Sequence, residues 1–123
     1  MLSLSRRDLH ALRHMLNPVE IPEEVFGFHA QQSVEKAFKA WLSLRGVDYP
    51  FEHDLKLLYQ LLEDLNETAI ERFKDLIELS DFAVQFRYQF FDDEPLDREG
   101  TLRSVTGLTA LVEKLINGGE ADS

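Results

Sequence analysis

The sequence predicts an all-α protein, an antiparallel four- to five-helix up-and-down bundle, and three observations support this prediction. Apolar residues recur every three or four positions over long stretches, as they do on a helix that buries one face. Proline and glycine divide the chain into these stretches. No stretch shows the sustained alternation of apolar and polar residues that is typical of a half-buried strand.

The first helix is expected over residues 5–16 and the second over residues 23–45. Ser5 stands at the N-cap position of the first helix, and Asp8 takes the place of the acidic partner in a capping box. The second stretch contains no proline, and Gly46 follows it where a glycine ends many helices. At 1.5 Å per residue this second helix would span about 33 Å.

The second helix has two contrasting faces. A spacing of about 100° per residue gathers its apolar side chains on one stripe, which we expect to be core. The opposite face is polar, and there Glu35 and Lys39 are spaced for an ion pair along the helix. The apolar stripe comprises Phe26, Ala30, Val34, Ala37, Trp41 and Leu44, with Phe38 on its flank. The polar face carries Phe28, Gln32, Glu35, Lys36 and Lys39.

Three further helices complete the predicted bundle. The third begins near His53 or Asp54, because a carboxylate there favours a helix N-terminus. The fourth is expected over residues 67–88, where Arg87 would fall in line with the apolar stripe and so need a partner. The last is expected over residues 98–116. Their apolar faces contain Leu55, Leu58, Leu61, Leu62 and Leu65; then Ala69, Phe73, Leu76, Ile77, Ala83 and Val84; then Val105, Leu108, Thr109, Val112 and Ile116. Residues 1–117 are predicted to form a single domain and residues 118–123 a disordered tail.

The net charge of −10 argues against a general nucleic-acid coat, because a polyanion would be repelled. This charge is unevenly distributed. Residues 1–46 have a balance of +1, whereas residues 47–123 have a balance of −11. We therefore expect any anion-binding surface to lie in the first third of the chain.

Direct inspection excludes several classes of site. The sequence has no phosphate-binding Gly-Lys-Ser/Thr loop, no dinucleotide fingerprint and no Gly-x-Ser-x-Gly elbow. It has no cysteine. His10 and His14 are one helical turn apart and could in principle hold a metal, but the residues between them lack the glutamate of a zincin. The acids at 92–94 do not match the spacing of a calcium loop. We expect no metal and no cofactor. Without a long apolar stretch we also expect no membrane span or signal peptide, and hence a cytoplasmic protein.

One run of residues matches a known pattern. Residues 28–42 read FHAQQSVEKAFKAWL, Gly46 follows, and His-Asp-Leu stands at 53–55 with Leu58 after it. This combination resembles the HEPN domain family, whose name stands for higher eukaryotes and prokaryotes nucleotide-binding. The resemblance implies a four- or five-helix bundle that forms a homodimer and is often encoded beside a minimal nucleotidyltransferase. Many members are metal-independent ribonucleases that act as toxins, and others are nucleotide-binding or partner-binding modules.

The ribonuclease members of this family carry an arginine, then four to six residues, then a histidine. Arg87 and Tyr88 look like the start of that segment, but no histidine follows His53. Acids stand at the three positions where the histidine would fall, and a carboxylate is a poor proton donor near neutral pH. The resemblance therefore predicts a nucleotide-binding or regulatory partner module of a toxin–antitoxin type pair. The alternatives are a structural adaptor, or a ribonuclease toxin that uses Arg87 with His53 or His29. The three acids are Asp92, Asp93 and Glu94.

The resemblance also selects the candidate residues for binding a nucleotide, an RNA or a protein partner, and each has a structural alternative. The two lysines are either phosphate contacts or part of a solvated helix face. The histidine and aspartate at 53 and 54 either line a cleft or cap a helix. Arg87 either faces a ligand or forms an internal ion pair. The candidates are His29, Gln32, Lys36, Lys39, His53, Asp54, Arg87 and Tyr88.

Overall fold

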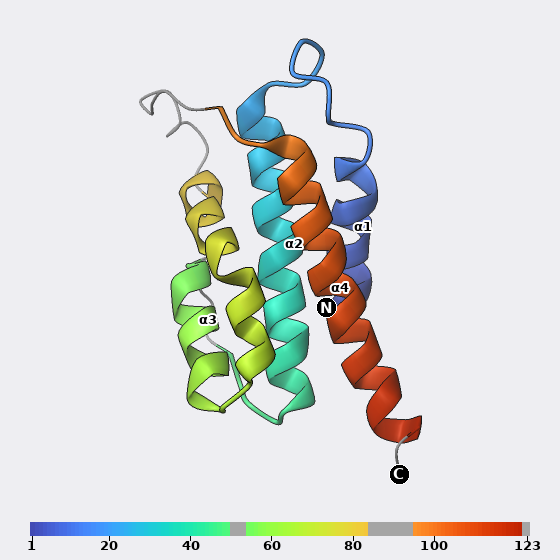
Figure 1. Ribbon diagram of the computed structural model, residues 1–123, viewed down its shortest axis with the longest axis vertical. Helices are drawn as coiled ribbons and strands as arrows, with labels where there is room; N and C mark the ends of the chain where they lie inside the picture. The colour runs from blue at the N-terminus through green and yellow to red at the C-terminus, as the bar shows by residue number, and fades with distance from the viewer. Residues whose placement is uncertain (50–53, 84–94, 122–123) are drawn as a thin grey trace.

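The computed structural model describes residues 1–49, 54–83 and 95–121. All regular structure within these ranges is helical, which confirms the predicted all-α bundle (Figure 1). The elements are α1 (Leu2–Leu12), α2 (Glu23–Leu44), α3 (Leu55–Asp64), η1 (Thr68–Ala83) and α4 (Arg98–Ala121).

Helix α2 is the centre of the bundle and packs against each of the other four elements. Helices α1 and α4 lie on one side of it, and α3 and η1 lie on the other (Figure 1). The predicted apolar stripe of α2 is buried as expected, except for Leu44 in the last turn, which is 36% exposed. Gly46 follows the helix with a φ of 76°, a conformation that favours glycine and explains the end of α2. Gly27 allows a close approach, because a Cβ atom there would overlap the ring of Phe82 on η1.

Helix α1 differs from its predicted bounds. It begins at Leu2 instead of Ser5 and ends at Leu12, four residues before the expected end. Ser5 is not a cap: it is fully buried inside the helix, where its Oγ donates a hydrogen bond to the carbonyl oxygen of Ser33 at 2.7 Å. The Ser33 Oγ donates in return to the carbonyl oxygen of Ser5 at 2.9 Å. Small side chains thus let α1 and α2 approach closely and satisfy each other's polar groups.

The capping prediction is confirmed at α3, where Asp54 accepts a hydrogen bond from the backbone nitrogen of Lys56 at 2.9 Å. The apolar face of this helix is buried as predicted at Leu55, Leu58 and Leu62, whereas Leu65 is 38% exposed. The start of α3 lies beside η1, because the Leu55 nitrogen donates to Ser80 Oγ at 2.9 Å.

The fourth element consists of two 3-10 segments that meet at a kink, rather than the single α-helix that the apolar pattern predicts. At the kink, Phe73 leaves helical backbone values, with φ −111° and ψ 16°. The buried side chains recur every third residue, at Ile70, Phe73, Leu76 and Leu79. That spacing matches the three residues per turn of 3-10 geometry. Of the predicted span, residues 84–88 lie outside the described part of the chain.

Helix α4 begins at Arg98 as predicted and continues through Ala121, beyond the expected end at Ile116. Its predicted apolar face is confirmed, with Val105, Leu108 and Val112 fully buried. The division into a domain over 1–117 and a tail over 118–123 stays a prediction.

Glu67 ties the start of the 3-10 segment to the end of α2. Its Oε1 accepts hydrogen bonds from Trp41 Nε1 at 2.7 Å and from Arg45 Nε at 2.6 Å. Burial raises the pKa of Glu67, but the two hydrogen bonds and the charge of Arg45 outweigh it and hold the pKa below its usual 4.5. Glu67, just before η1, contacts the end of α2, and Ser80, near the end of η1, contacts the start of α3. The 3-10 segment thus leads from the end of α2 to the start of α3, so α3 runs in the same direction as α2.

We expect the substitution Glu67→Gln to lower the free energy of unfolding by about 1–2 kcal/mol at pH 7, because charge-assisted hydrogen bonds are lost. A folded-state pKa below the unfolded value stabilises the protein above pH 4.5, and this contribution disappears as pH falls through the lowered pKa. The two proteins should therefore converge in stability as the pH falls through the lowered pKa of Glu67. Urea unfolding followed by the fluorescence of Trp41, the single tryptophan, measures this. A stability difference that persists unchanged at pH 3 would contradict the assignment.

Candidate functional site

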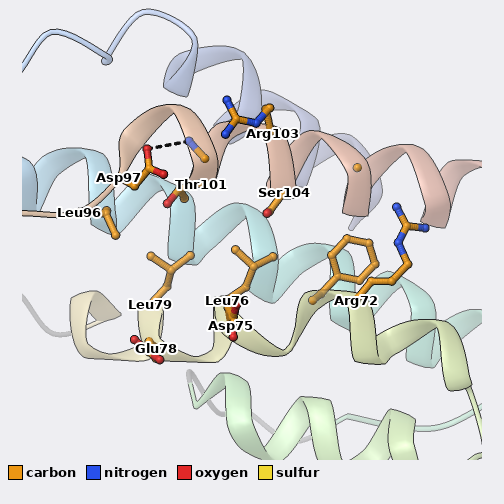
Figure 2. Close-up of a pocket in the computed structure, with 13 residues that line it drawn as sticks. Arg72, Asp75, Leu76, Glu78, Leu79, Leu96, Asp97, Thr101, Arg103 and Ser104 are labelled. Atoms are coloured by element: carbon orange, nitrogen blue, oxygen red, sulfur yellow. Dashed lines mark hydrogen bonds between the residues drawn. The ribbon is translucent and has the colours of Figure 1, made fainter.

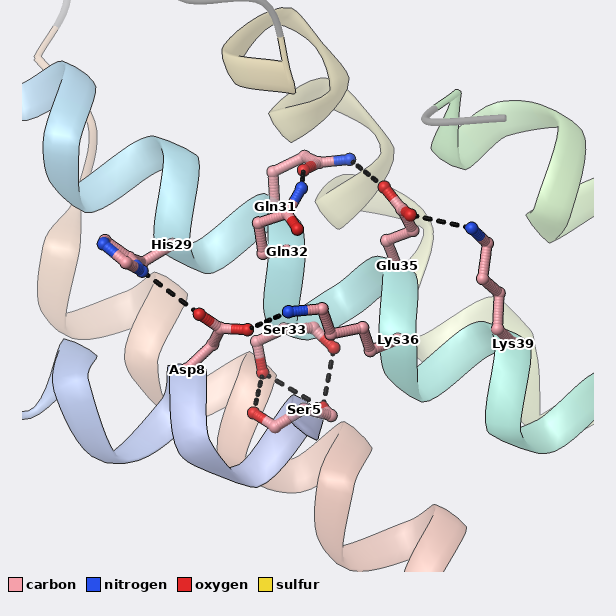
Figure 3. Close-up of polar contacts among 9 residues, drawn as sticks. All are labelled: Ser5, Asp8, His29, Gln31, Gln32, Ser33, Glu35, Lys36 and Lys39. Atoms are coloured by element: carbon pink, nitrogen blue, oxygen red, sulfur yellow. Dashed lines mark hydrogen bonds and ion pairs between the residues drawn. The ribbon is translucent and has the colours of Figure 1, made fainter. Parts of the chain in front are cut away.

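Asp8 links the first two helices through both of its carboxylate oxygens (Figure 3). Its Oδ2 lies 2.8 Å from Lys36 Nζ, and its Oδ1 lies 3.1 Å from His29 Nδ1. The side chains of Asp8 and Lys36 are 14% and 23% exposed, and that of His29 is 33% exposed. Asp8 therefore serves as a contact between helices rather than as the capping residue that the sequence predicted.

A second set of polar contacts runs along α2 (Figure 3). Gln32 Nε2 donates to Gln31 Oε1 at 2.7 Å, and Gln31 Nε2 donates to Glu35 Oε1 at 2.9 Å. Lys39 Nζ then donates to Glu35 Oε2 at 2.8 Å, which confirms the predicted ion pair. Its ammonium also lies 5.3 Å from the centre of the Tyr49 ring. A continuous hydrogen-bonded row thus runs through the side chains of Gln32, Gln31, Glu35 and Lys39.

The alternative of a solvated helix face is wrong for Lys39, which is 5% exposed, and its partner Glu35 is 4% exposed. Because α2 is central, neighbouring elements cover both of its faces, and polar groups there must find partners within the protein. Gln31, fully buried, is a residue that the sequence analysis missed. The signal was present, since positions 31, 35 and 39 are four residues apart and share one face of a helix.

The structure brings part of the predicted site together. Four of the candidates lie along α2: His29, Gln32, Lys36 and Lys39. Asp54 lies at the start of α3, where its carboxylate accepts a hydrogen bond from the backbone nitrogen of Lys56. The remaining candidates, His53, Arg87 and Tyr88, lie outside the described residues, as do Asp92, Asp93 and Glu94.

The contact between Asp8 and His29 has a definite chemical consequence. When Nδ1 carries the ring proton and donates it to the carboxylate, Nε2 becomes the acceptor nitrogen of the imidazole. An aspartate in this position also fixes the orientation of the ring, as it does in proton-transferring sites. His29 is thus an oriented imidazole with one third of its side chain exposed.

A separate pocket of about 570 Å³ lies between η1 and α4 (Figure 2). Leu76 and Leu79 extend into it from η1, and Thr101 and Ser104 line it from α4. None of the described candidate residues lines this pocket. In the described ranges, no cluster of three or more histidines and acids is arranged to hold a metal, and no helix is long and apolar enough to cross a membrane.

Comparison with protein families decides the membership of the chain. The model of the HEPN domain matches residues 1–117, nearly the whole length. The chain belongs to the HEPN domain family. This places it among nucleotide-binding or ribonuclease-like modules. Searches of curated proteins and of solved structures give no match.

In this HEPN protein the residues that carry the family resemblance, 28–42, form most of α2. The central position of that helix explains why so many of its polar residues are paired internally. Lys36 and Lys39 each have a carboxylate partner at 2.8 Å. The pair of Lys36 joins α2 to α1, whereas the pair of Lys39 lies within α2.

We expect Lys39→Met to lower the free energy of unfolding by about 3 kcal/mol, because it breaks the buried ion pair with Glu35. Lys36→Met should cost less, about 1 kcal/mol, since its pair is more exposed. The matched control is Lys56→Met, at an exposed lysine without an ion pair in the described ranges, which should change stability little. Urea unfolding midpoints measure all three. Equal midpoints for the variants at positions 39 and 56 would contradict a structural role for Lys39.

Proposed function

We propose that this HEPN protein is a non-cleaving regulatory module of the cytoplasm. Its partner would be a minimal nucleotidyltransferase, with which it would form a toxin–antitoxin type pair. The observation that carries the proposal is the internal pairing of the two lysines on α2. Lys36 is bound to Asp8 and Lys39 to Glu35, so neither presents a free charge to a phosphate.

The pairing of Lys39 is the stronger of the two arguments. Its side chain is 7% exposed and that of Glu35 is 6% exposed. A phosphate that approached Lys39 would have to displace a buried carboxylate, and breaking a buried ion pair is costly. Nucleotide binding through this lysine is therefore disfavoured, whereas docking of a protein partner does not require it.

The sequence around Arg87 supports the same proposal. The three positions that carry the histidine in ribonuclease members are occupied here by Asp92, Asp93 and Glu94. Carboxylates with ordinary pKa values near 4 are ionised at pH 7, so they are poor general acids and repel the phosphate of an RNA. A chain of this kind is suited to binding and regulation rather than cleavage.

We expect the protein to be a homodimer when purified alone and to form a stable complex when co-expressed with the nucleotidyltransferase encoded beside its gene. The complex should remain intact through size-exclusion chromatography with light scattering. A nucleotidyltransferase from an unrelated pair is the control. Absence of such a neighbouring gene, or a failure of the two proteins to co-elute, would contradict the proposed partnership.

A metal-independent ribonuclease is the second candidate function, and the contact between Asp8 and His29 favours it. An oriented imidazole on α2 would supply the proton transfer that the acids after Arg87 do not. This candidate therefore names His29 as the general base and Arg87 as the group that contacts the phosphate.

An RNA cleavage assay separates the two candidates. We expect RNA incubated with the protein in EDTA at pH 7 to stay intact, because the proposed module does not cleave. The variants His29→Gln and Arg87→Ala are tested beside the wild type. Cleavage by the wild type that both substitutions abolish would overturn the first candidate and support the second.

A further inference from the structure

The outer side of α1 is unusually cationic for a protein with a net charge of −10. Four basic residues fall within eight positions, and all four are exposed: Arg6, Arg7, His10 and Arg13. Together with Ser3 and Leu9 they line a hollow of about 500 Å³. No acidic residue lines this hollow.

The positive charge of this surface is not neutralised by the rest of the described structure. Arg7 and Arg13 form no ion pair there. Arg6 pairs with Glu113 at 3.0 Å, but the two side chains are 57% and 43% exposed, so the pair is weak and easily exchanged. Asp8, the acid of α1, is turned away toward His29 and Lys36.

Helix α1 has no acid in its first turn, and Arg6 and Arg7 follow that turn directly. His10 lies in the last turn and Arg13 is the C-cap, where basic residues are favourable for a helix. An anion bound in the hollow would be attracted mainly by the guanidinium groups of Arg6, Arg7 and Arg13.

We propose that this hollow on α1 binds the phosphate groups of a nucleotide or of a single-stranded RNA. Arginine suits this ligand, because its planar guanidinium donates two parallel hydrogen bonds to one phosphate. Arg6 and Arg13 are seven residues apart, about 10.5 Å along the helix axis. That separation lets the guanidinium groups contact different phosphates of one ligand.

A second copy of the chain is a poor occupant of the same surface. A two-fold contact through α1 would place arginines against arginines, because such an interface uses one patch on both subunits. A head-to-tail contact with the acidic part of another copy would build a ring or an open filament rather than the two-fold dimer that is commonest among oligomers. A phosphate ligand meets neither objection, and the surface lies in the part of the chain where the charge distribution predicts anion binding.

This inference goes beyond the proposed function and does not depend on it. The nucleotidyltransferase complex is detected by co-elution, whereas phosphate binding is detected with the protein alone. The two proposals can therefore fail separately.

The test is fluorescence anisotropy of a labelled ten-nucleotide RNA in EDTA and low salt, with sodium tripolyphosphate as competitor. The double substitution Arg7→Gln, Arg13→Gln should weaken RNA binding roughly tenfold and reduce the dependence of log affinity on log salt by about 1.4, since two phosphate contacts are lost. The matched control is Lys56→Gln, Lys74→Gln, which removes the same charge at exposed positions of α3 and η1 and should leave the affinity within about twofold.

Each outcome decides the proposal. Competition by tripolyphosphate identifies a site for compact polyphosphates such as nucleotides, and RNA binding that resists it identifies a site for an extended strand. Both results support phosphate binding at α1. Equal RNA affinities of the two double variants would overturn the proposal. Failure of the wild type to bind the labelled RNA at 20 mM salt would also overturn it. Unchanged urea midpoints show that the variants are folded.

Discussion

The rest of the structure depends on the compensation of charge inside α2. A helix that packs against four neighbours has no fully solvated side, yet its polar residues include Gln31, Glu35 and Lys39, all nearly buried. Burial of a charge is tolerated only when another charge or a set of hydrogen bonds replaces the lost water. The row of contacts from Gln32 to Lys39 supplies such hydrogen bonds and an opposite charge along α2. It allows a polar sequence to occupy the centre of a bundle.

The sequence predicted the helical class and most of the buried apolar positions, because the period of apolar residues records which face of a helix is covered. It did not predict which helix is central, since a polar residue such as Lys39 reads the same whether it meets water or a buried carboxylate. The 3-10 geometry of η1 also escaped prediction. The apolar residues of this segment fit more than one helical period, so the sequence does not show which of them are buried. In the structure the neighbouring elements cover positions 70, 73, 76 and 79, whereas Ala69 and Ile77 are only partly buried.

The candidate site was predicted in part. The family resemblance selected His29, Gln32, Lys36 and Lys39, and the structure shows which of them are joined to carboxylates. The partner of two of them, Asp8, was missed because it lies twenty-one residues before His29 and matched a local capping pattern. Contacts across such separations follow from tertiary packing, and no local spacing indicates them. His53, Arg87 and Tyr88 lie outside the described residues, so their place in the site stays a prediction.

The packing of α1 against α4 bears on how the protein folds during synthesis. These two helices are the first and last elements of the bundle. Arg6 of α1 pairs with Glu113 of α4, and Arg98 at the start of α4 donates to the carbonyl oxygen of Met15, three residues beyond the end of α1. Ribosomes extend a chain by about 5–20 residues per second. The side of α1 that faces α4 thus stays exposed for several seconds before α4 is synthesised. The complete bundle forms only after the last helix has been translated.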